Sequence, residues 1–224
     1  MADRCLLYYI TDRSQFRGHE LDRRGALLAK VAEATRAGVD YIQLRERDLS
    51  ARELETLARD ARTAVRNSAL LRTGAESGTR ILINSRTDIA LAAGMDGVHL
   101  RADDLTPNEV RQVLKASAHG PWTEYFLVAA SCHSNEDVKR AESEAVDFAV
   151  FAPVFGKSSA PGTQPTGLAA LHDACRTKIT MFALGGVTME NAQSCRNAGA
   201  AGIAGIRLFQ ENRIEDVVRT LRAL

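Results

Sequence analysis

The sequence predicts a single (β/α)8 barrel, and three observations support this fold class. The chain has 224 residues, which is enough for one large α/β domain. A phrase in which an alanine-rich helical stretch ends at a small residue and leads into an apolar strand occurs four times, at 37–44, 93–100, 144–151 and 198–205. Between successive copies there is room for one more strand and one more helix. We therefore expect eight alternating units in one domain spanning 1–224, with an open doubly wound sheet as the alternative.

The expected strands are short apolar runs, as in parallel strands that are buried on both faces. Four of them end the repeated phrases, and the other four lie at 5–11, 80–84, 125–131 and 179–185. Segments with helical periodicity lie at about 21–37, 51–66, 86–93, 107–115, 135–144, 167–175, 188–198 and 213–222. Residues 67–79 are expected to form a surface loop before the third strand.

Capping residues mark the start of several of these helices. Glu or Asp follows a possible cap by three residues at Ser50, Thr106 and Ser134, and Pro107 suits a first helical position. Thr188 is the expected cap of the seventh helix.

The charge balance excludes several classes of partner. The chain has 29 basic and 28 acidic residues, for a formal net charge of +1, so no overall field attracts nucleic acid or an anionic membrane. The apolar run near the N-terminus is shorter than a signal peptide core or a membrane span, so we expect a cytoplasmic protein. Cys5, Cys132, Cys175 and Cys195 form no CxxC pair and are expected to be reduced thiols.

In this fold the site lies where the strands end, and the residues there are polar. They are Gln43, Arg45 and Arg47 at the second strand, Asn84 at the third, His99, Arg101, Asp103 and Asp104 at the fourth, and Ser131 and His133 at the fifth. After the sixth strand comes a long loop, 152–167, with glycine, proline, hydroxyl residues and Lys157. Its length and composition indicate a binding loop more than a connector.

Glycines at the last two strand exits predict a phosphate site. Gly185 and Gly186 would let backbone amides approach a ligand, and the next helix would add the partial positive charge of its N-terminus. Gly202 and Gly205 would allow the same close approach to a ligand, and the amides of Ile206 and Arg207 after them would bind it in the same way. The alternative is that these glycines serve tight packing of the turns.

The charged residues each leave two interpretations open. Arg45 and Arg47 are two residues apart, so on a strand they would share one face and need an anion, or they would pair with Glu46 or Asp48. Asp103 and Asp104 would hold Mg²⁺ or form a solvated turn and helix cap. His99 and His133 would be hydrogen-bonded structural histidines or site residues.

Together these motifs resemble the thiamine phosphate synthase family, including its thiazole tautomerase relatives, which share a (β/α)8 barrel. The resemblance covers almost the whole chain, in the blocks YYITDR, YIQLRERD, ILINSRTDIALAAGMDGVHL, SCHSNEDVKRAESEAVDFAVFAPVF and FALGGVTMENAQSCRNAGAAGIAGI. It implies that hydroxymethylpyrimidine pyrophosphate loses pyrophosphate with the help of Mg²⁺ and that the thiazole nitrogen of thiazole phosphate captures the resulting cation. Small-molecule substrates are the implied partners, and a homo-oligomer is compatible with the resemblance.

The resemblance also implies a role for each motif residue. Gln43, Arg45, Arg47 and Asn84 would hold the pyrophosphate and the pyrimidine, and Asp104 would bind the metal. Ser131, His133 and Lys157 would act at the reacting centre. The thiazole phosphate would bind the amides of Gly185, Gly186, Ile206 and Arg207.

The chain departs from the usual synthase pattern at three places. Ser85 follows Asn84 where the synthases have a metal-binding Asp, Arg101 begins a segment that usually reads Gly-Gln-x-Asp, and Lys157 lies earlier in its loop than the usual lysine. The tautomerase relatives also lack the Asp after the third strand and use a histidine matching His133 in proton transfer. Synthase is the favoured function, with a tautomerase and a non-catalytic thiazole or thiamine phosphate-binding regulator as alternatives.

Overall fold

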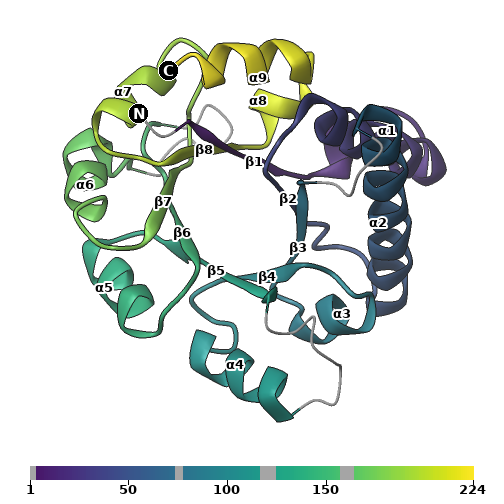
Figure 1. Cartoon of the computed structure of the whole chain (residues 1–224), viewed down its shortest axis with the longest axis horizontal. Coiled ribbons are helices and arrows are strands. Elements are labelled where there is room, and N and C mark those ends of the chain that lie inside the picture. The colour runs from purple at the N-terminus through teal and green to yellow at the C-terminus, as the bar shows by residue number, and fades with distance from the viewer. Residues whose placement is uncertain (1–3, 74–77, 117–124, 157–163) are drawn as a thin grey trace.

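Eight parallel strands close into one barrel in the order β1 to β8, which confirms the (β/α)8 fold and rules out the open sheet (Figure 1). The computed structural model describes residues 4–73, 78–116, 125–156 and 164–224. The strands are β1 (Leu6–Ile10), β2 (Tyr41–Leu44), β3 (Arg80–Asn84), β4 (Gly97–Leu100), β5 (Leu127–Cys132), β6 (Phe148–Phe151), β7 (Thr180–Ala183) and β8 (Gly202–Gly205).

The helices surround the barrel, and α1 and α2 lie side by side in Figure 1. They are η1 (Arg13–Gln15), α1 (Glu20–Ala37), α2 (Ala51–Thr73), α3 (Thr87–Ala92), α4 (Pro107–Ala116), α5 (Asn135–Ser143), α6 (Gly167–Ala174), α7 (Ala192–Asn197), α8 (Arg207–Gln210) and α9 (Ile214–Arg222). The predicted caps are confirmed at three starts. Ser50 and Thr106 exchange hydrogen bonds with the glutamates three residues on, and the Ser134 hydroxyl accepts from the Asp137 amide.

Two predicted boundaries are wrong. The helix α2 continues to Thr73, so residues 67–73 are not a loop; this segment has no glycine or proline before Gly74 and contains strong helix formers. The helix α7 begins at Ala192, not after Thr188. The Asn191 side chain accepts the Thr188 amide at 2.8 Å and holds 188–191 in a turn instead.

Alternate residues of each strand separate two apolar regions. Tyr8 and Ile10 of β1 face the barrel interior, where they pack with Phe148 and Phe182. Tyr9 faces outward and packs on Phe209 in the larger region between the barrel and the helices. Side chains on a strand alternate between its two faces. The inward residues of β1 and the register of each strand pair therefore identify the inward residues of the other strands.

The repeated sequence phrase has a structural counterpart at the amino ends of the strands. An aspartate carboxylate just before β2, β4 and β6 accepts the amide of the second residue of the preceding strand. These bonds join Asp40 to Leu7, Asp96 to Ile81 and Asp147 to Val128, at 2.7, 2.8 and 2.6 Å. The fourth phrase has Ala201 at the matching position. The pairs β1–β2, β3–β4 and β5–β6 therefore share an aspartate–amide hydrogen bond that Ala201 cannot form between β7 and β8.

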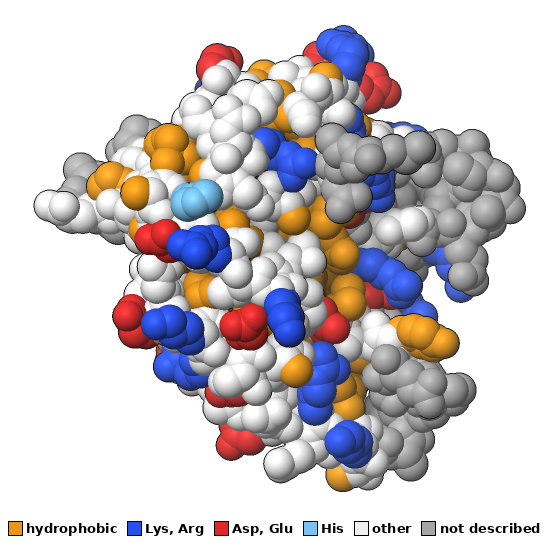
Figure 2. Space-filling model, turned by 60° about the vertical axis from the view of Figure 1, so that its left-hand side comes forward, with side chains coloured by type: hydrophobic (Ala, Val, Ile, Leu, Met, Phe, Trp, Pro, Cys, Tyr) orange, Lys and Arg blue, Asp and Glu red, His pale blue; other side chains and the backbone are white. Residues whose placement is uncertain are grey.

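The cysteines and the surface agree with the composition. All four cysteines are free thiols, and burial raises the pKa of Cys132 and of Cys195 to about 12. On the face shown in Figure 2, basic and acidic side chains are interspersed, as a net charge of +1 allows. Among the described residues, no helix has the length and apolar character needed to cross a membrane.

Candidate active site

The inward residues at the carboxyl ends of the strands divide the barrel mouth into a polar and an apolar half. The polar half is formed by β2 to β5 through Gln43, Asn84, His99 and Ser131, of which Asn84 pairs in register with His99. The apolar half is formed by β6, β7, β8 and β1 through Val150, Leu184, Ile206 and Ile10. Because side chains alternate between the inner and outer faces of each strand, four of the predicted polar residues lie together on one side of the mouth.

His99 links the barrel interior to Ser131 at the mouth. Its Nδ1 lies 3.1 Å from the hydroxyl of Tyr8, and its Nε2 lies 2.8 Å from Ser131 Oγ. His99 is buried, and burial, with a smaller effect from the charge of Arg45, lowers its pKa to about 3. His99 is therefore neutral at physiological pH. The interpretation of His99 as a hydrogen-bonded structural histidine is therefore confirmed. One of its two partners, Ser131, is a predicted site residue.

Gln43, Asn84 and Ser85 form a short row of polar side chains beside His99. Asn84 donates from Nδ2 to Ser85 Oγ at 2.9 Å, and Gln43 Nε2 lies 3.5 Å from Asn84 Oδ1. Ser85 adopts a left-handed φ of 65°, which is uncommon outside glycine, Asn and Asp. The residue that replaces the usual Asp therefore orients the amide of Asn84.

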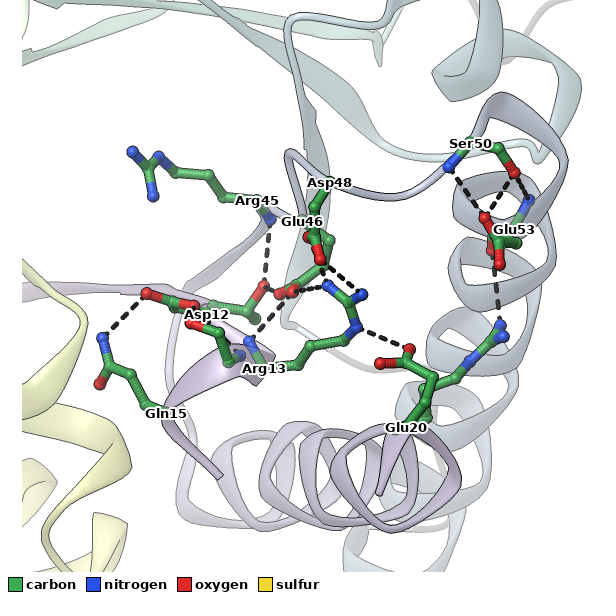
Figure 3. Close-up of polar contacts among 12 residues, drawn as sticks. Asp12, Arg13, Gln15, Glu20, Arg45, Glu46, Asp48, Ser50 and Glu53 are labelled. Atoms are coloured by element: carbon green, nitrogen blue, oxygen red, sulfur yellow. Dashed lines mark hydrogen bonds and ion pairs between the residues drawn. The ribbon is translucent and has the colours of Figure 1, made fainter. Parts of the chain in front are cut away.

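Arg13 anchors the loop that follows β2. Its guanidinium pairs with Glu46 at 3.2 Å, Asp48 at 2.6 Å and Glu20 at 2.8 Å (Figure 3). Glu46 is buried and also accepts the hydroxyl of Thr11. These contacts fasten the exit of β2 to the exit of β1. They also occupy Glu46 and Asp48, so the predicted alternative in which these carboxylates pair with Arg45 or Arg47 is wrong.

Arg45 extends away from this cluster, as Figure 3 shows. Its guanidinium makes no hydrogen bond or ion pair with any described residue, and burial together with nearby Arg47 lowers its pKa. Asp12 and Glu46 offset part of this effect without pairing with the guanidinium, and a half-buried cation that is not paired with a carboxylate of the described residues favours binding of an anion. Arg101 is a further positive charge that acts on Arg45.

Arg47 does not share a strand face with Arg45, so that prediction is wrong. The strand β2 ends at Leu44, and Arg47 lies exposed in the turn that follows. The spacing rule for strand faces does not apply beyond the strand end.

Gly186 is glycine because of packing at the exits of β6 and β7. It has a φ of +64°, and a Cβ there would lie 2.6 Å from the carbonyl oxygen of Gly156. Gly185, at φ 95°, accepts the amide of Phe155 at 2.9 Å. The close contact explains the glycine at 186, and the positive φ explains the one at 185.

The glycines of β8 are also required by packing. A Cβ on Gly202 would lie 2.5 Å from the ring of Phe182, and one on Gly205 would lie 2.9 Å from Leu208. Gly202 therefore leaves room for the aromatic interior, and its predicted role in close approach to a ligand is wrong.

Backbone amides nevertheless remain open at the exits of β7 and β8. The amides of Gly185, Gly186 and Ile206 donate no hydrogen bond to a described residue. Arg207 is exposed and begins the short helix α8, with Ile206 as its cap. The expected helix N-terminus after Gly186 is absent there because α7 starts at Ala192.

Asp104 acts as a cap in the turn after β4. Its Oδ2 accepts the amide of Arg101 at 2.6 Å, while Asp103 pairs with the Arg101 guanidinium at 2.7 Å. No group of three or more potential metal ligands occurs among the described residues. Asp104 and Ser131 border one cavity of about 110 Å³, which lies outside the barrel between the exits of β4 and β5 and the helices α4 and α5. A larger cavity, of about 520 Å³, lies at the opposite ends of the strands beside Arg80 and Asp96.

His133 is exposed, and its Nδ1 lies 2.7 Å from the carbonyl oxygen of Ala152. Because a carbonyl only accepts, Nδ1 carries a proton and the Nε2 of neutral His133 has a free lone pair. Lys157 lies outside the described residues.

Sequence reasoning missed Tyr8 and Arg13. The signal for Tyr8 is its place two residues before the end of an apolar strand, which puts it on the same face as Ile10. Arg13 had no local signal, since its partners Glu46 and Asp48 are more than thirty residues away.

Comparisons with known proteins agree with this architecture. A family model described as thiamine monophosphate synthase matches residues 7–209. A protein of Aquifex aeolicus with the provisional name of thiamine-phosphate synthase 2 is 39% identical over 92% of this chain and 97% of its own length. Thiamine-phosphate synthase of Methanoculleus marisnigri is 34% identical over 96% of this chain and 93% of its own length.

A solved structure shares the fold. Thiamine phosphate pyrophosphorylase from Pyrococcus furiosus superposes with a TM-score of 0.76, covering 99% of this chain and 95% of that chain at 24% identity. The family match and the coverage of these relatives show that the chain belongs to the thiamine-phosphate synthase family of enzymes.

Proposed function

We propose that this protein joins hydroxymethylpyrimidine pyrophosphate and thiazole phosphate to give thiamine phosphate and pyrophosphate. The observation that carries this proposal is the divided barrel mouth. Its polar half presents the guanidinium of Arg45, and its apolar half is bordered by the amides of Gly186 and Ile206, none of which is hydrogen-bonded to a described residue. Two anionic substrates with one aromatic ring each match these two halves.

In the polar half, Arg45 and the exposed Arg47 hold the pyrophosphate. Fixed cationic groups stabilise the charge that develops on a leaving pyrophosphate, and their preorganisation by the Arg13 anchor lowers the cost of reorganisation. Gln43 and Asn84 offer amide groups to the pyrimidine from the neighbouring strands β2 and β3. Ser131 lies beside them at the exit of β5.

In the apolar half, the thiazole phosphate binds the amides of Gly185, Gly186, Ile206 and Arg207. Ile206 and Leu184 supply apolar contact for the ring. Binding both substrates in the barrel mouth converts a bimolecular reaction into an effectively unimolecular one. Exclusion of water protects the cationic intermediate. Lys157 and His133 stay sequence-based predictions at the reacting centre.

Asp104 fits Mg²⁺ only as part of a shared site. Its Oδ1 accepts no hydrogen bond from a described residue and is open to a cation. Mg²⁺ is commonly held by one or two carboxylates together with substrate phosphates and water, so the substrate's pyrophosphate would complete the site. When bound, the ion would neutralise charge on the leaving pyrophosphate.

The test is a two-substrate assay of the purified protein that follows thiamine phosphate with and without Mg²⁺. We expect metal-dependent product, and we expect Arg45→Met to lower kcat/KM at least 10-fold while Arg213→Met, in an exposed ion pair, leaves it unchanged. No product from folded protein would contradict the proposal. Isomerisation of carboxythiazole phosphate that is lost in His133→Asn would instead identify a tautomerase.

A further inference from the structure

We propose that Tyr8, acting through His99, fixes the hydroxyl of Ser131 as a hydrogen-bond donor to the ligand. Tyr8 and His99 would then be positioning residues, and the ligand atom next to Ser131 would be an acceptor, a neutral ring nitrogen or an anionic oxygen. The three side chains form one line of hydrogen bonds from the barrel interior to the mouth.

The first step concerns the proton of Tyr8. Its side chain is fully buried among the rings of Tyr41, Phe148 and Phe182. Burial raises the pKa of its hydroxyl well above the usual value, so the proton is retained. The acceptor that the described residues offer this proton is Nδ1 of His99, at 3.1 Å. A buried hydroxyl proton without an acceptor is costly, so Tyr8 donates and Nδ1 accepts.

The second step concerns the imidazole. A neutral imidazole has one N–H, and His99 is neutral because it is buried and near Arg45. Since Nδ1 accepts from Tyr8, the N–H of His99 is on Nε2. This nitrogen lies 2.8 Å from Ser131 Oγ and donates to it.

The third step concerns Ser131. Its oxygen accepts from His99, so the hydroxyl proton is left to donate elsewhere. Ser131 is half-buried at the carboxyl end of β5, and its side chain lies on the inward face of the strand beside His99, at the mouth of the barrel. The relay therefore presents a hydrogen-bond donor to the barrel mouth. It also prevents His99 from acting as a base on Ser131, because the protonated Nε2 has no lone pair to accept the hydroxyl proton, so His99 does not activate Ser131 as a nucleophile.

Adjacent tyrosines provide a matched pair of variants. Tyr8→Phe removes the donor to His99 and keeps the ring that packs in the interior. Tyr9→Phe removes a buried hydroxyl that has no hydrogen-bond partner among the described residues and that faces away from the interior. Tyr9→Phe therefore controls for the loss of a buried tyrosine hydroxyl beside the relay.

The direct test is ¹⁵N NMR of the histidine side chains in protein labelled with ¹⁵N-histidine, with His99 assigned from the missing signal in His99→Gln. We expect His99 to be protonated at Nε2 and unprotonated at Nδ1 in the wild type and in Tyr9→Phe. In Tyr8→Phe we expect a mixture of tautomers. A proton on Nδ1 in the wild type, or an unchanged tautomer in Tyr8→Phe, would overturn the proposal.

A kinetic test rests on the proposed function. We expect Tyr8→Phe to lower kcat roughly 3- to 10-fold, the range of one hydrogen bond, and Tyr9→Phe to leave it unchanged. In a Ser131→Ala background, Tyr8→Phe should change kcat less than about 2-fold, because Tyr8 acts only through Ser131. An equal loss in both backgrounds would contradict the relay. If the wild type forms no thiamine phosphate, the proposed function fails while the NMR result still decides the tautomer.

Discussion

Arg13 illustrates at the residue scale how a buried charge organises the loop beside the site. Its side chain is 6% exposed and that of Glu46 is 1% exposed. Removing one partner of such a pair leaves the other charge buried and uncompensated, whereas exposed pairs contribute little. The amide of Arg45 donates to the hydroxyl of Thr11, which in turn donates to Glu46, so the position of Arg45 depends on the ion pair between Arg13 and Glu46.

We expect Arg13→Met to lower the free energy of unfolding by roughly 3–5 kcal/mol, because Glu46 loses its counter-charge inside the protein. Urea denaturation at neutral pH measures the change. Arg213→Met is the control: its partner is Glu215, both side chains are mostly exposed, and the expected loss is below about 1 kcal/mol. An equal loss of unfolding free energy in the two variants would show that the buried ion pairs of Arg13 contribute no more to stability than an exposed pair.

His99 predicts a pH dependence of stability. Its pKa is lowered to about 3 in the folded protein from 6.5, so between these values the unfolded chain binds the additional proton. The contribution is therefore complete above pH 6.5 and is lost as the pH falls toward 3, with a slope of at most about 1.4 kcal/mol per pH unit.

The comparison is with His99→Gln, which retains every other titrating group. We expect the difference in unfolding free energy between wild type and His99→Gln to shrink by about 2 kcal/mol from pH 7.5 to pH 5. Urea denaturation at both pH values measures this difference. A difference that is independent of pH would contradict the lowered pKa.

At the scale of elements, the effect of a glycine on stability depends on the helix, strand or turn in which it lies. Gly186 has a positive φ and touches the exit of β6, whereas Gly25 lies exposed within α1 with open space around its Cα. A side chain at the first position strains the backbone, and one at the second favours the helix.

We expect Gly186→Ala to destabilise the protein by roughly 1–3 kcal/mol and Gly25→Ala to stabilise it by about 0.5–1 kcal/mol. Thermal denaturation followed by circular dichroism gives the sign of each change. A stabilised Gly186→Ala would contradict the contact between the exits of β6 and β7.

The sequence predicted the elements better than it predicted the site. Alternation along strands such as β1 and β4 depends on neighbouring residues alone, so the barrel and the inward residues His99 and Ser131 could be inferred. The reason for Gly186 lies in the carbonyl of Gly156, thirty residues earlier. The Tyr8 relay joins β1, β4 and β5. Contacts of this kind arise only when the barrel closes.

At the scale of the whole molecule, the barrel is closed by side chains as well as by strand pairing. Arg222 of the last helix donates to the carbonyls of Cys5 and Gly38 and pairs with Asp40. Asp40 in turn accepts the amide of Leu7 in β1. The last helix, α9, is thus connected to the segments that lead into the first two strands.

The aspartates before alternate strands should each contribute to stability. We expect Asp96→Ala to lower the unfolding free energy by about 1–3 kcal/mol, because the amide of Ile81 loses its acceptor. Asp96→Asn keeps an acceptor oxygen and should cost less. Urea denaturation of both variants measures the costs, and an Asp96→Ala protein as stable as the wild type would contradict this role.

We expect the strand pair that has Ala201 in place of an aspartate to open before the other three pairs. The amides of Leu7, Ile81 and Val128 are each held by a carboxylate, while Met181, at the matching place in β7, has Ala201 opposite it. Amide exchange with solvent reports local opening, and we expect Met181 to exchange first of the four. The pair formed by β7 and β8, which leads to the open amides of the apolar half, would then be the part of the barrel that opens locally most often.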